Sequence, residues 1–546
     1  MAMHSSMYHD LHRAAQRYPD NVALNYHGTR ISFTQLLQHI DRMAASFANL
    51  GLAAGDRVCL CLPNIPQTVI AFYALNRLGA VPCMVHPLST AVELEAYLTE
   101  TESKVLITLD FLYPKFEGVV NTLSIDRTIV THANEQLPLL LSVLYYLKQG
   151  YKSPSLVGKK RVTFWREMQR ARTAGTQQEP YVFGPNRVAL ILFSGGTTGK
   201  AKGVSLSNES MHALAQEIIA QVDPKPGVDS MLCILPLFHG FGLGISLHPV
   251  LIAGGCCILV PRFSPKEFAS TIIRNRPAYI AGVPTLFEGF LSNKKIQQAD
   301  LSFLKGAFCG GDVTHPDLIK RFNQFVRSRG SSTTLREGYG LTECVTACSI
   351  MPEGVYKEGS VGLPFASISI KVVDPDTLAD RPAGEIGEIC ISGPTVMLGY
   401  YRREKESMQA LRPHKDGAVW LHTGDLGYMD QEGYLYFVQR LKRIIKVSGY
   451  TVYPSQVEAV LNTHPLVQES CVVGVPCPIK MQKPKAFVVL KSSVADPTSS
   501  VAQIMDFLQE RLIKWSVPAE IVICDALPRT AVGKVAHTVL ERQGDN

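Results

Sequence analysis

Apolar runs of strand length alternate with longer helical patterns through the first two thirds of the chain. Runs at 57–62 and 80–85 enclose 66–78, which has the length and the spacing of apolar positions typical of a helix. This alternation predicts layered α/β structure, because strands that are joined through helices form sheets that the helices then cover. We expect a large N-terminal domain of this kind over residues 1–438.

Towards the C-terminus the pattern changes twice. At 368–373 and 386–392 the strands are short, and turns rich in Gly, Pro and Asp separate them, which predicts a small β unit beside the α/β layers. A mixed set of elements follows Gln439, with predicted helices at 455–462 and 501–515 and predicted strands at 471–475 and 486–490. We therefore expect a second, α+β domain over residues 439–546.

The composition fits a large globular protein. The chain has 546 residues, of which 46% are hydrophobic, so it has ample material for more than one core. Its formal net charge of +7 is modest for this length, and no long basic run, zinc-ligand spacing or aromatic-basic ladder accompanies it. Nucleic acid is therefore not an expected partner.

Part of the positive charge is local. Residues 148–170 carry a cluster of Lys and Arg side chains that only Glu167 answers, and this cluster follows an apolar run at 137–147. The run is too short to cross a bilayer as a helix, which takes about 20 residues. Two interpretations stay open: an amphipathic element that lies on an anionic membrane surface, or a buried helix with a solvated charged flank.

The cysteines indicate a reducing compartment. Thirteen of them are scattered without a CxxC pair, and residues 1–15 lack the continuous apolar core of a signal peptide. We expect a cytoplasmic protein. Peripheral contact with a membrane surface stays open. Cys344 and Cys348 have no second pair to complete a metal site, so buried free cysteine is the favoured interpretation.

A loop rich in glycine and hydroxyl groups follows the apolar run at 188–193. Its positions are Ser194, Gly195, Gly196, Thr197, Thr198, Gly199 and Lys202. Backbone N–H groups, hydroxyls and a lysine charge in this order are suited to holding a polyphosphate. The Walker-type phosphate loop is disfavoured, because it needs Gly where Ser194 stands and Ser or Thr where Ala201 stands. A plain surface loop is the alternative that composition alone would favour.

Four later segments carry the remaining candidate chemistry. Residues 337–343 combine Tyr339, Thr342 and Glu343, which suit a purine face, a phosphate oxygen and magnesium. Asp425 follows a turn, and its carboxylate can accept hydrogen bonds from two ribose hydroxyls. The segment 439–450 is basic, and Lys534 lies on a glycine-containing turn close to the C-terminus. Taken singly, each segment is equally well explained as an ordinary turn or surface strand.

In this order and at these separations the segments resemble the motif series of the adenylate-forming acyl-CoA synthetases. That superfamily also contains the beetle luciferases and the adenylation domains of peptide synthetases. The resemblance covers nearly the whole chain, and it extends to the segments 62–64, 236–240, 310–312, 359–364 and 399–401. It implies a large N-terminal domain and a small, mobile C-terminal domain.

The resemblance also implies a role for each position. The 194–204 loop would close over the β- and γ-phosphates of ATP, Glu343 would help to hold Mg²⁺, Tyr339 would pack on adenine, and Asp425 with Arg440 would bind ribose. Lys534 would bridge the substrate carboxylate and the α-phosphate, with Thr342 and Glu343 as further catalytic residues. Gly311, Asp312, Gly338 and Lys446 are further cofactor-binding positions. Lys442 falls at the hinge, Gly449 at the wall of the pantetheine tunnel, and His239 beside the acyl pocket.

Several positions depart from the commonest pattern of the family. Gly195 replaces a usual Ser and Ala201 a usual Pro, but the hydroxyls that remain keep ATP binding the expectation. Gln439 stands where Gly is frequent, and Arg443 where an acid is frequent. These last two positions bear on the timing of the domain rotation.

The expected function is an ATP-dependent acid–thiol ligase that forms an acyl-CoA through an acyl adenylate. A medium- or long-chain fatty acid is the favoured substrate, on the strength of the 137–147 run and the apolar stretch 241–255. An aryl acid such as a cinnamate or benzoate, and an acyl carrier protein in place of coenzyme A, stay open. A sensor without turnover is disfavoured, because Lys534 and Glu343 are groups that only the chemistry needs.

Overall fold

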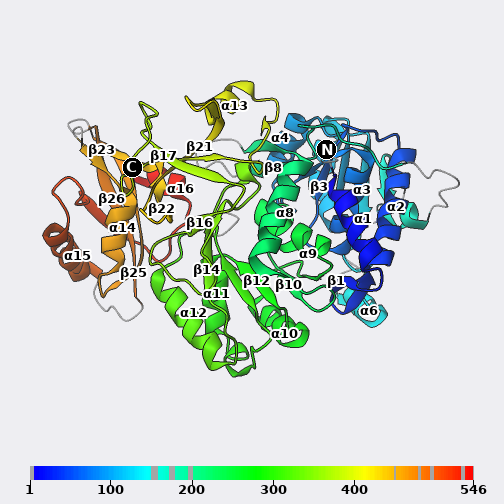
Figure 1. The fold of residues 1–546 in the computed structure, drawn as a ribbon, viewed down its shortest axis with the longest axis horizontal. Helices are drawn as coiled ribbons and strands as arrows, with labels where there is room; N and C mark the ends of the chain where they lie inside the picture. The colour runs from blue at the N-terminus through cyan, green and yellow to red at the C-terminus, as the bar shows by residue number, and fades with distance from the viewer. Residues whose placement is uncertain are drawn as a thin grey trace. The chain divides into compact units, whose positions relative to one another are not determined.

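The computed structural model describes residues 5–148, 156, 158–170, 179–194, 201–447, 450–477, 481–491, 497–529 and 535–544. Two compact units make up the chain. The first comprises Met1–Ser194, Ala201–Ser369 and Ile391–Leu421, and the second includes Ile370–Cys390 and His422–Asn546. The prediction of layered α/β sheets followed by a smaller α+β part is confirmed (Figure 1).

The first unit contains two large sheets. In the described residues, one has nine strands in the order β16-β15-β14-β13-β12-β10-β11-β1-β2, and the other has eight in the order β19-β9-β8-β4-β3-β5-β6-β7. The strands of the nine-stranded sheet are β16 (Leu363–Pro364), β15 (Ser349–Ile350), β14 (Leu335–Tyr339), β13 (Gly306–Cys309), β12 (Tyr279–Gly282), β10 (Ser230–Cys233), β11 (Cys256–Leu259), β1 (Val22–Tyr26) and β2 (Thr29–Ser32). Those of the eight-stranded sheet are β19 (Gly399–Tyr400), β9 (Lys202–Leu206), β8 (Leu190–Ser194), β4 (Val81–Met84), β3 (Arg57–Cys61), β5 (Val105–Leu109), β6 (Arg127–Thr131) and β7 (Val162–Phe164).

Helices cover both sheets. They are α1 (Met7–Arg17), α2 (Phe33–Asn49), α3 (Pro66–Leu78), α4 (Ala91–Thr101), α5 (Tyr113–Thr122), α6 (Leu139–Lys148), α7 (Trp165–Arg170), α8 (Asn208–Val222), α9 (His248–Ile252), α10 (Pro265–Asn275), α11 (Pro284–Ser292), α12 (Pro316–Ser328) and α13 (Glu404–Ala410), with short turns η1 (Asp110–Leu112) and η4 (Ile296–Gln298). Aromatic side chains of α10, α11 and α12, such as Phe268, Phe290 and Phe322, pack on the apolar strands of the nine-stranded sheet to form one core. These three helices lie together in Figure 1.

A five-stranded sheet follows, ordered β17-β18-β21-β20 with β22 paired to β21. Its strands in the described chain are β17 (Ser369–Val373), β18 (Gly387–Ser392), β20 (Leu411–Pro413), β21 (Val419–Met429) and β22 (Leu435–Arg440). This is the small β unit that the sequence predicts. The chain passes from one unit to the other within β17, within β18 and within β21.

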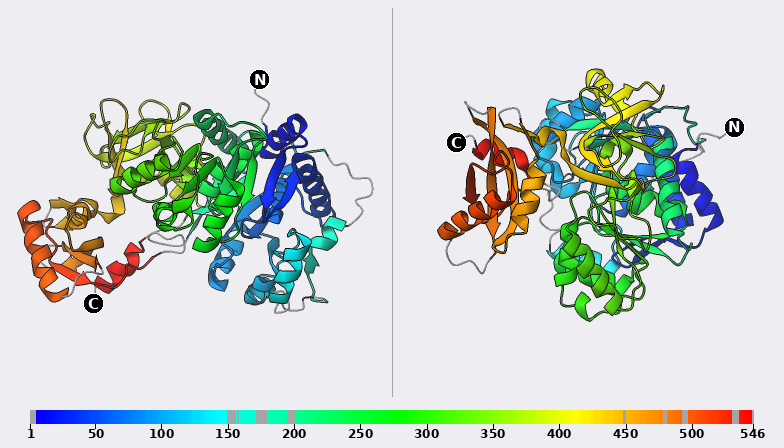
Figure 2. Two further views of the ribbon diagram at one scale, coloured as in Figure 1. Left: turned by 90° about the horizontal axis from the view of Figure 1, so that it is seen from below. Right: turned by 60° about the vertical axis from the view of Figure 1, so that its left-hand side comes forward.

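The C-terminal α+β part consists of β23 (Ile445–Val447), β24 (Tyr450–Val452), α14 (Pro454–Asn462), β25 (Val467–Cys477), β26 (Met481–Leu490), α15 (Pro497–Arg511), β27 (Glu520–Ile523) and α16 (His537–Gly544). Side chains alternate between the faces of its sheet. Val472 and Val488 pack with α14 and α15, whereas Val473 and Phe487 pack with Leu540 of α16. Helices therefore cover both faces of this small sheet (Figure 2).

One helix shows an apolar face to solvent. Most of the run at 137–147 lies in α6 (Leu139–Lys148), and its apolar side chains Leu140, Val143, Leu144 and Leu147 are exposed. The alternative of a buried helix is therefore wrong for these positions. Among the described residues, none of the helices is both long and apolar enough to cross a membrane.

Candidate active site

The phosphate-binding loop predicted from the sequence joins the two strands of a hairpin. Strand β8 ends at Ser194 and β9 begins at Lys202, and these two residues face each other in antiparallel register. The Ser194 hydroxyl donates to the Lys202 carbonyl over 3.5 Å. Gly195, Gly196, Thr197, Thr198 and Gly199 lie outside the described residues. Both ends of the loop are thus anchored in one sheet.

A chain of side chains links the loop to the carboxylate predicted to hold magnesium. The Lys202 Nζ lies over the ring of Tyr400, 4.4 Å from its centroid. The Tyr400 hydroxyl donates to Oε1 of Glu343 over 2.9 Å. A lysine charge, an aromatic ring and a carboxylate therefore lie together, although the sequence separates them widely.

The exit strand of the loop is braced from two sides. Strand β19 pairs with β9, with Gly399 opposite Ser205 and Tyr400 opposite Val204. The Glu100 carboxylate accepts from the Gly203 N–H over 3.1 Å and from Arg403, whose Nε and Nη2 donate over 3.1 and 2.8 Å. A bidentate pair of this kind fixes orientation as well as distance. Tyr400 is therefore held in a defined position beside Lys202.

The strand end that carries Tyr339 is tightly packed. Tyr339 closes β14 and is buried, and Thr342 and Glu343 follow in the short turn η5 (Thr342–Cys344). Between them, Gly340 leaves no space for a side chain, because a Cβ there would lie 1.9 Å from the Thr346 carbonyl oxygen. Tyr339 and Glu343 therefore keep a fixed spacing.

A strained turn follows Glu343. Val345 has a φ of +66°, which a β-branched residue rarely adopts. The Thr346 N–H donates to the Cys344 carbonyl over 2.8 Å and closes a three-residue γ-turn around Val345. Strain of this kind persists where the surrounding structure imposes it, and it occurs often at functional sites.

The glycine pair Gly310 and Gly311 lies beside the Tyr339 strand end. Strands β13 and β14 are parallel neighbours, so the turn after β13 emerges at the same edge of the sheet as Tyr339. Asp312 is exposed in this turn, and its Oδ1 accepts from the Val313 N–H over 2.9 Å. A Cβ on Gly310 would lie 3.1 Å from the Gly338 carbonyl oxygen. The structure thus brings the two predicted cofactor-binding turns together.

Glu337 ties these two turns to each other, and the sequence analysis assigned it no role. Its Oε1 accepts from the Thr314 N–H over 3.2 Å, two residues beyond Asp312. Burial raises the pKa of Glu337 to about 7. Glu337 follows Arg336 in β14, so the sequence pattern alone does not mark it as a buried acid.

His239 lies in a segment that packs on the Glu343 turn. The His239 Nδ1 accepts from the Phe241 N–H over 3.1 Å, just before the π-helical segment η3 (Gly242–Leu247). Next to it, a Cβ on Gly240 would lie 1.8 Å from the Val345 carbonyl oxygen. The Phe241 ring approaches Gly310 on the other side. His239 therefore shares one region with both cofactor-binding turns.

Asp425 and Arg440, the residues predicted to bind ribose, are direct partners in the β21–β22 ladder. The Arg440 Nε lies 2.8 Å from Asp425 Oδ1. Asp425 is buried, and Arg440 is partly exposed. Two residues that are distant in sequence thus form one polar unit.

Both unusual residues noted near the predicted hinge have hydrogen-bond or ion-pair partners. Gln439 is buried, and its Oε1 accepts from the N–H and hydroxyl of Ser455 over 3.3 and 3.2 Å. Arg443 pairs with Glu458 over 2.5 Å. Lys442 is exposed in η6 (Leu441–Arg443), and Lys446 belongs to β23. Gly449 and Lys534 lie outside the described residues.

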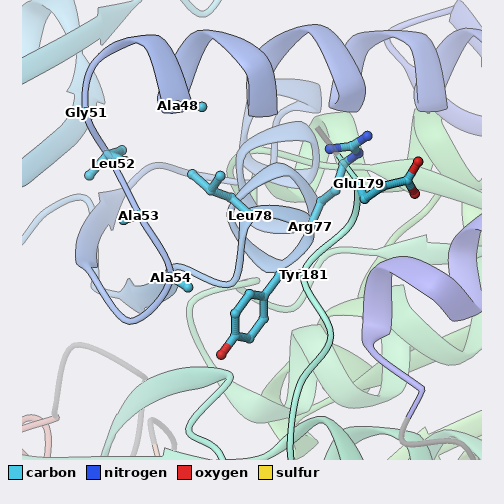
Figure 3. Close-up of a pocket in the computed structure, with 9 residues that line it drawn as sticks. All are labelled: Ala48, Gly51, Leu52, Ala53, Ala54, Arg77, Leu78, Glu179 and Tyr181. Atoms are coloured by element: carbon cyan, nitrogen blue, oxygen red, sulfur yellow. The ribbon is translucent and has the colours of Figure 1, made fainter. Parts of the chain in front are cut away.

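One further pocket, of about 350 Å³, involves none of the predicted site residues. It is lined by Arg77, Leu78, Glu179 and Tyr181 and by residues of the segment 48–54 (Figure 3). The guanidinium of Arg77 already pairs with Asp41 over 2.8 Å.

Two family models identify the class of this protein as an AMP-binding enzyme. Residues 11–401 match the family described as AMP-binding enzyme, and residues 456–534 match the AMP-binding enzyme C-terminal domain. The chain therefore belongs to this family, which confirms the resemblance seen in the sequence.

The similarity to curated relatives and to solved structures extends over almost the whole chain. The chain is 34% identical over 539 residues to a long-chain-fatty-acid–CoA ligase of Bacillus subtilis, covering 98% of this chain and 94% of the relative. A long-chain-fatty-acid–CoA ligase of Escherichia coli is 34% identical over 544 residues, covering 97% and 92%. The anthranilate CoA ligase AuaEII, solved in complex with anthranoyl-AMP, superposes with a TM-score of 0.84 at 25% identity, covering 100% of this chain and 98% of that chain.

Proposed function

We propose that this enzyme is an ATP-dependent acid–thiol ligase that converts a medium- or long-chain fatty acid to its acyl-CoA through an acyl adenylate. The observation that carries the proposal is the chain Lys202–Tyr400–Glu343, which joins the glycine-rich hairpin to the carboxylate beside Tyr339. The names of the relatives at 34% identity support a fatty acid as the substrate.

The reaction takes two steps. A carboxylate oxygen of the acid attacks the α-phosphorus of ATP, pyrophosphate leaves, and an acyl adenylate forms. The thiolate of coenzyme A then attacks the acyl carbon and AMP leaves. In the first step two anions approach each other, so positioned positive charge and hydrogen-bond donors supply most of the catalysis.

The proposed roles follow from this demand. Ser194, Gly195, Gly196, Thr197, Thr198, Gly199 and Lys202 hold the phosphates; Tyr339 packs on adenine; Asp425 and Arg440 bind ribose; Thr342 and Lys534 act at the reacting phosphate; Gly311, Asp312, Gly338, Lys446 and Gly449 serve cofactor binding; His239 lines the acyl pocket. Lys534 is a mobile point charge that is suited to bridge two anions.

Mg²⁺ is proposed to bind at Glu343. A carboxylate is a hard oxygen donor of the type that magnesium uses beside substrate phosphates. The Tyr400 hydrogen bond occupies one of several lone pairs of this carboxylate, so the group is oriented and still able to act as a ligand. The ion, when bound, neutralises phosphate charge.

The two steps need different faces of the C-terminal domain. We propose domains over 1–438 and 439–546, with Lys442 at the hinge between them. Rotation about this hinge would withdraw Lys534 after adenylation and bring Gly449 to the thiol path. The polar contacts of Gln439 and Arg443 flank Lys442, and they are suited to set how readily the hinge moves.

An aryl acid is the second candidate substrate, because the anthranilate CoA ligase shares the fold over the whole chain. A carrier protein is the second candidate acceptor. The test is magnesium-dependent pyrophosphate release with fatty and aromatic acids, each with and without coenzyme A. CoA-dependent turnover of fatty acids is the expected result. A preference for aromatic acids, or adenylate that only a carrier protein consumes, would replace the corresponding part of the proposal.

A further inference from the structure

Helix α6 presents a continuous apolar face to solvent. Leu140, Val143, Leu144 and Leu147 follow the spacing i, i+3, i+4 and i+7, which places them on one side of a helix. They are 73%, 47%, 51% and 66% exposed. Single exposed apolar residues are ordinary, but four on one face of one helix mark an interaction surface.

The residues that follow α6 favour an anionic partner. Lys160, Arg161, Arg166 and Arg170 are exposed, and Glu167 is the one acid between them in sequence. An apolar helix face with exposed basic residues close by in the chain is the composition of elements that lie in the interface of an anionic membrane. The same segment on a second copy carries the same positive charge, so charge complementarity favours an anionic lipid surface over self-association through this face.

We infer that α6 docks this enzyme on an anionic lipid surface, with its apolar face among the acyl chains and the basic residues over the headgroups. The inference does not depend on the proposed reaction, although a membrane would supply a fatty acid to it. Burial of four large side chains is a substantial apolar contribution to binding.

The test is sedimentation of the full chain with vesicles, at low and high salt. Vesicles of phosphatidylcholine with phosphatidylglycerol should retain the protein, and vesicles of phosphatidylcholine alone should retain it at least fivefold less. The double variant Leu140→Ser/Leu144→Ser should lose most of the binding. Its matched control is Val182→Ser/Val228→Ser, because those valines are 80% and 73% exposed in other segments.

Equal sedimentation of both double variants would overturn the inference. So would a concentration-dependent dimer that Leu140→Ser/Leu144→Ser converts to monomer without any effect on vesicle binding, because the apolar face would then belong to a second copy. Pyrophosphate release in the absence of vesicles should be the same in all these proteins, since none of the four positions belongs to the proposed site.

A second inference comes from the buried carboxylate of Glu388 in β18, which is 5% exposed. A buried carboxylate needs hydrogen-bond donors, and both of its oxygens have one. Oε1 accepts from the Gly424 N–H over 3.0 Å, and Oε2 lies 2.8 Å from Nδ1 of His422. Glu388 thus contacts both ends of the turn that precedes Asp425.

Thr423 adds two hydrogen bonds that hold the same turn. Its hydroxyl donates to the Ile389 carbonyl over 2.7 Å and accepts from the Asp425 N–H over 3.0 Å. Gly424 has a φ of +68° with open space around it, so the glycine is needed for the backbone conformation and not for room. The position of Asp425 therefore depends on the two adjacent residues Glu388 and Ile389.

We propose that Glu388 is a positioning residue for the ribose, acting through Asp425 without touching the nucleotide. This inference rests on the proposed role of Asp425. Because the ribose contact should form equally in the ground state and the transition state, loss of Glu388 should raise the KM for ATP and leave kcat almost unchanged.

The test compares ATP with 2′,3′-dideoxy-ATP in pyrophosphate release. Glu388→Ala should raise the KM for ATP roughly tenfold, with kcat within about twofold, and should reduce the preference for ATP over the dideoxy nucleotide. Glu388→Gln keeps an acceptor for the Gly424 N–H, so it should lie between wild type and Ala. In an Asp425→Ala background, Glu388→Ala should add little, as expected for residues that act as one unit.

Glu217 provides a matched control. It is also a buried glutamate, and it accepts from the N–H groups of Ala366 and Ser367 over 3.3 and 2.7 Å. Glu217→Ala should lower the Tm without changing the nucleotide preference. If Asp425→Ala keeps the preference for ATP, the ribose assignment is wrong. If only Asp425→Ala loses it and both Glu388 variants keep it, the ribose assignment stands and the positioning role is refuted.

Discussion

The hydroxyl of Tyr400 is expected to orient the proposed magnesium ligand. Tyr400→Phe removes one oxygen and keeps the ring, so the contact of Lys202 with the ring face should persist while Glu343 Oε1 loses its donor. The perturbation therefore separates the hydrogen bond from the cation–π contact within one side chain.

The magnitude follows from the kind of bond that is lost. A hydrogen bond to a charged group contributes about 1.5–3 kcal/mol when buried, and partial exposure of this pair reduces that to about 1–1.5 kcal/mol. At 1.36 kcal/mol per factor of ten, the apparent affinity for magnesium should fall about five- to tenfold. Losses of about 10–100-fold are typical for well-buried partners of metal ligands, so this value lies at the low end.

The assay is pyrophosphate release at saturating ATP and acid over a range of magnesium concentrations. Tyr401→Phe is the control, because the neighbouring ring packs with Val81 and Ile191. Tyr400→Phe should shift the magnesium dependence while Tyr401→Phe leaves it in place. Identical magnesium curves for wild type and Tyr400→Phe would refute the assignment of Glu343 as a ligand that Tyr400 orients.

Two further predictions concern Lys534 and Glu337. Lys534→Ala should abolish adenylate formation and leave thioester formation from pre-made acyl adenylate largely intact, because the lysine is proposed to act in the first step only; equal loss of both steps would remove that role. Burial raises the pKa of Glu337 to about 7, above that of a free glutamate, so its contribution to stability is present at low pH and is lost as the pH rises through about 7. Glu337→Gln cannot ionise, so the Tm of wild type should fall relative to that of the variant between about pH 4.5 and 7 and keep a constant offset at higher pH. Parallel Tm curves would mean that Glu337 titrates normally.

Hydrophobic patterning alone predicted the bounds of some elements well. The helix predicted at 66–78 is α3, and the run at 57–62 is β3. The strands predicted at 471–475 and 486–490 are longer in the structure, as β25 and β26. Their side chains alternate between two faces, and each face packs against a different helix layer. Periodicity places such residues on a face but does not locate the end of a strand.

Residues that act through tertiary neighbours were harder to find. The sequence motifs include Tyr400 as part of a turn, but its partners Lys202 and Glu343 are far away in the sequence. Glu388 interrupts the apolar strand β18, which signals a buried polar function without naming the partner, whereas Glu337 stands beside Arg336 and carries no such signal. Those partners depend on strand order, and single-sequence patterns do not determine strand order.

The formation of an acyl adenylate is the central claim, and isotope transfer tests it most directly. The protein is incubated with MgATP, coenzyme A and a long-chain fatty acid whose carboxylate carries ¹⁸O, and the AMP and phosphate products are analysed by mass spectrometry. Attack of the carboxylate on the α-phosphorus leaves one labelled oxygen on AMP when the thiol takes the acyl group, so labelled AMP with unlabelled pyrophosphate is the predicted result. Unlabelled AMP, or label in inorganic phosphate together with ADP, would contradict the account.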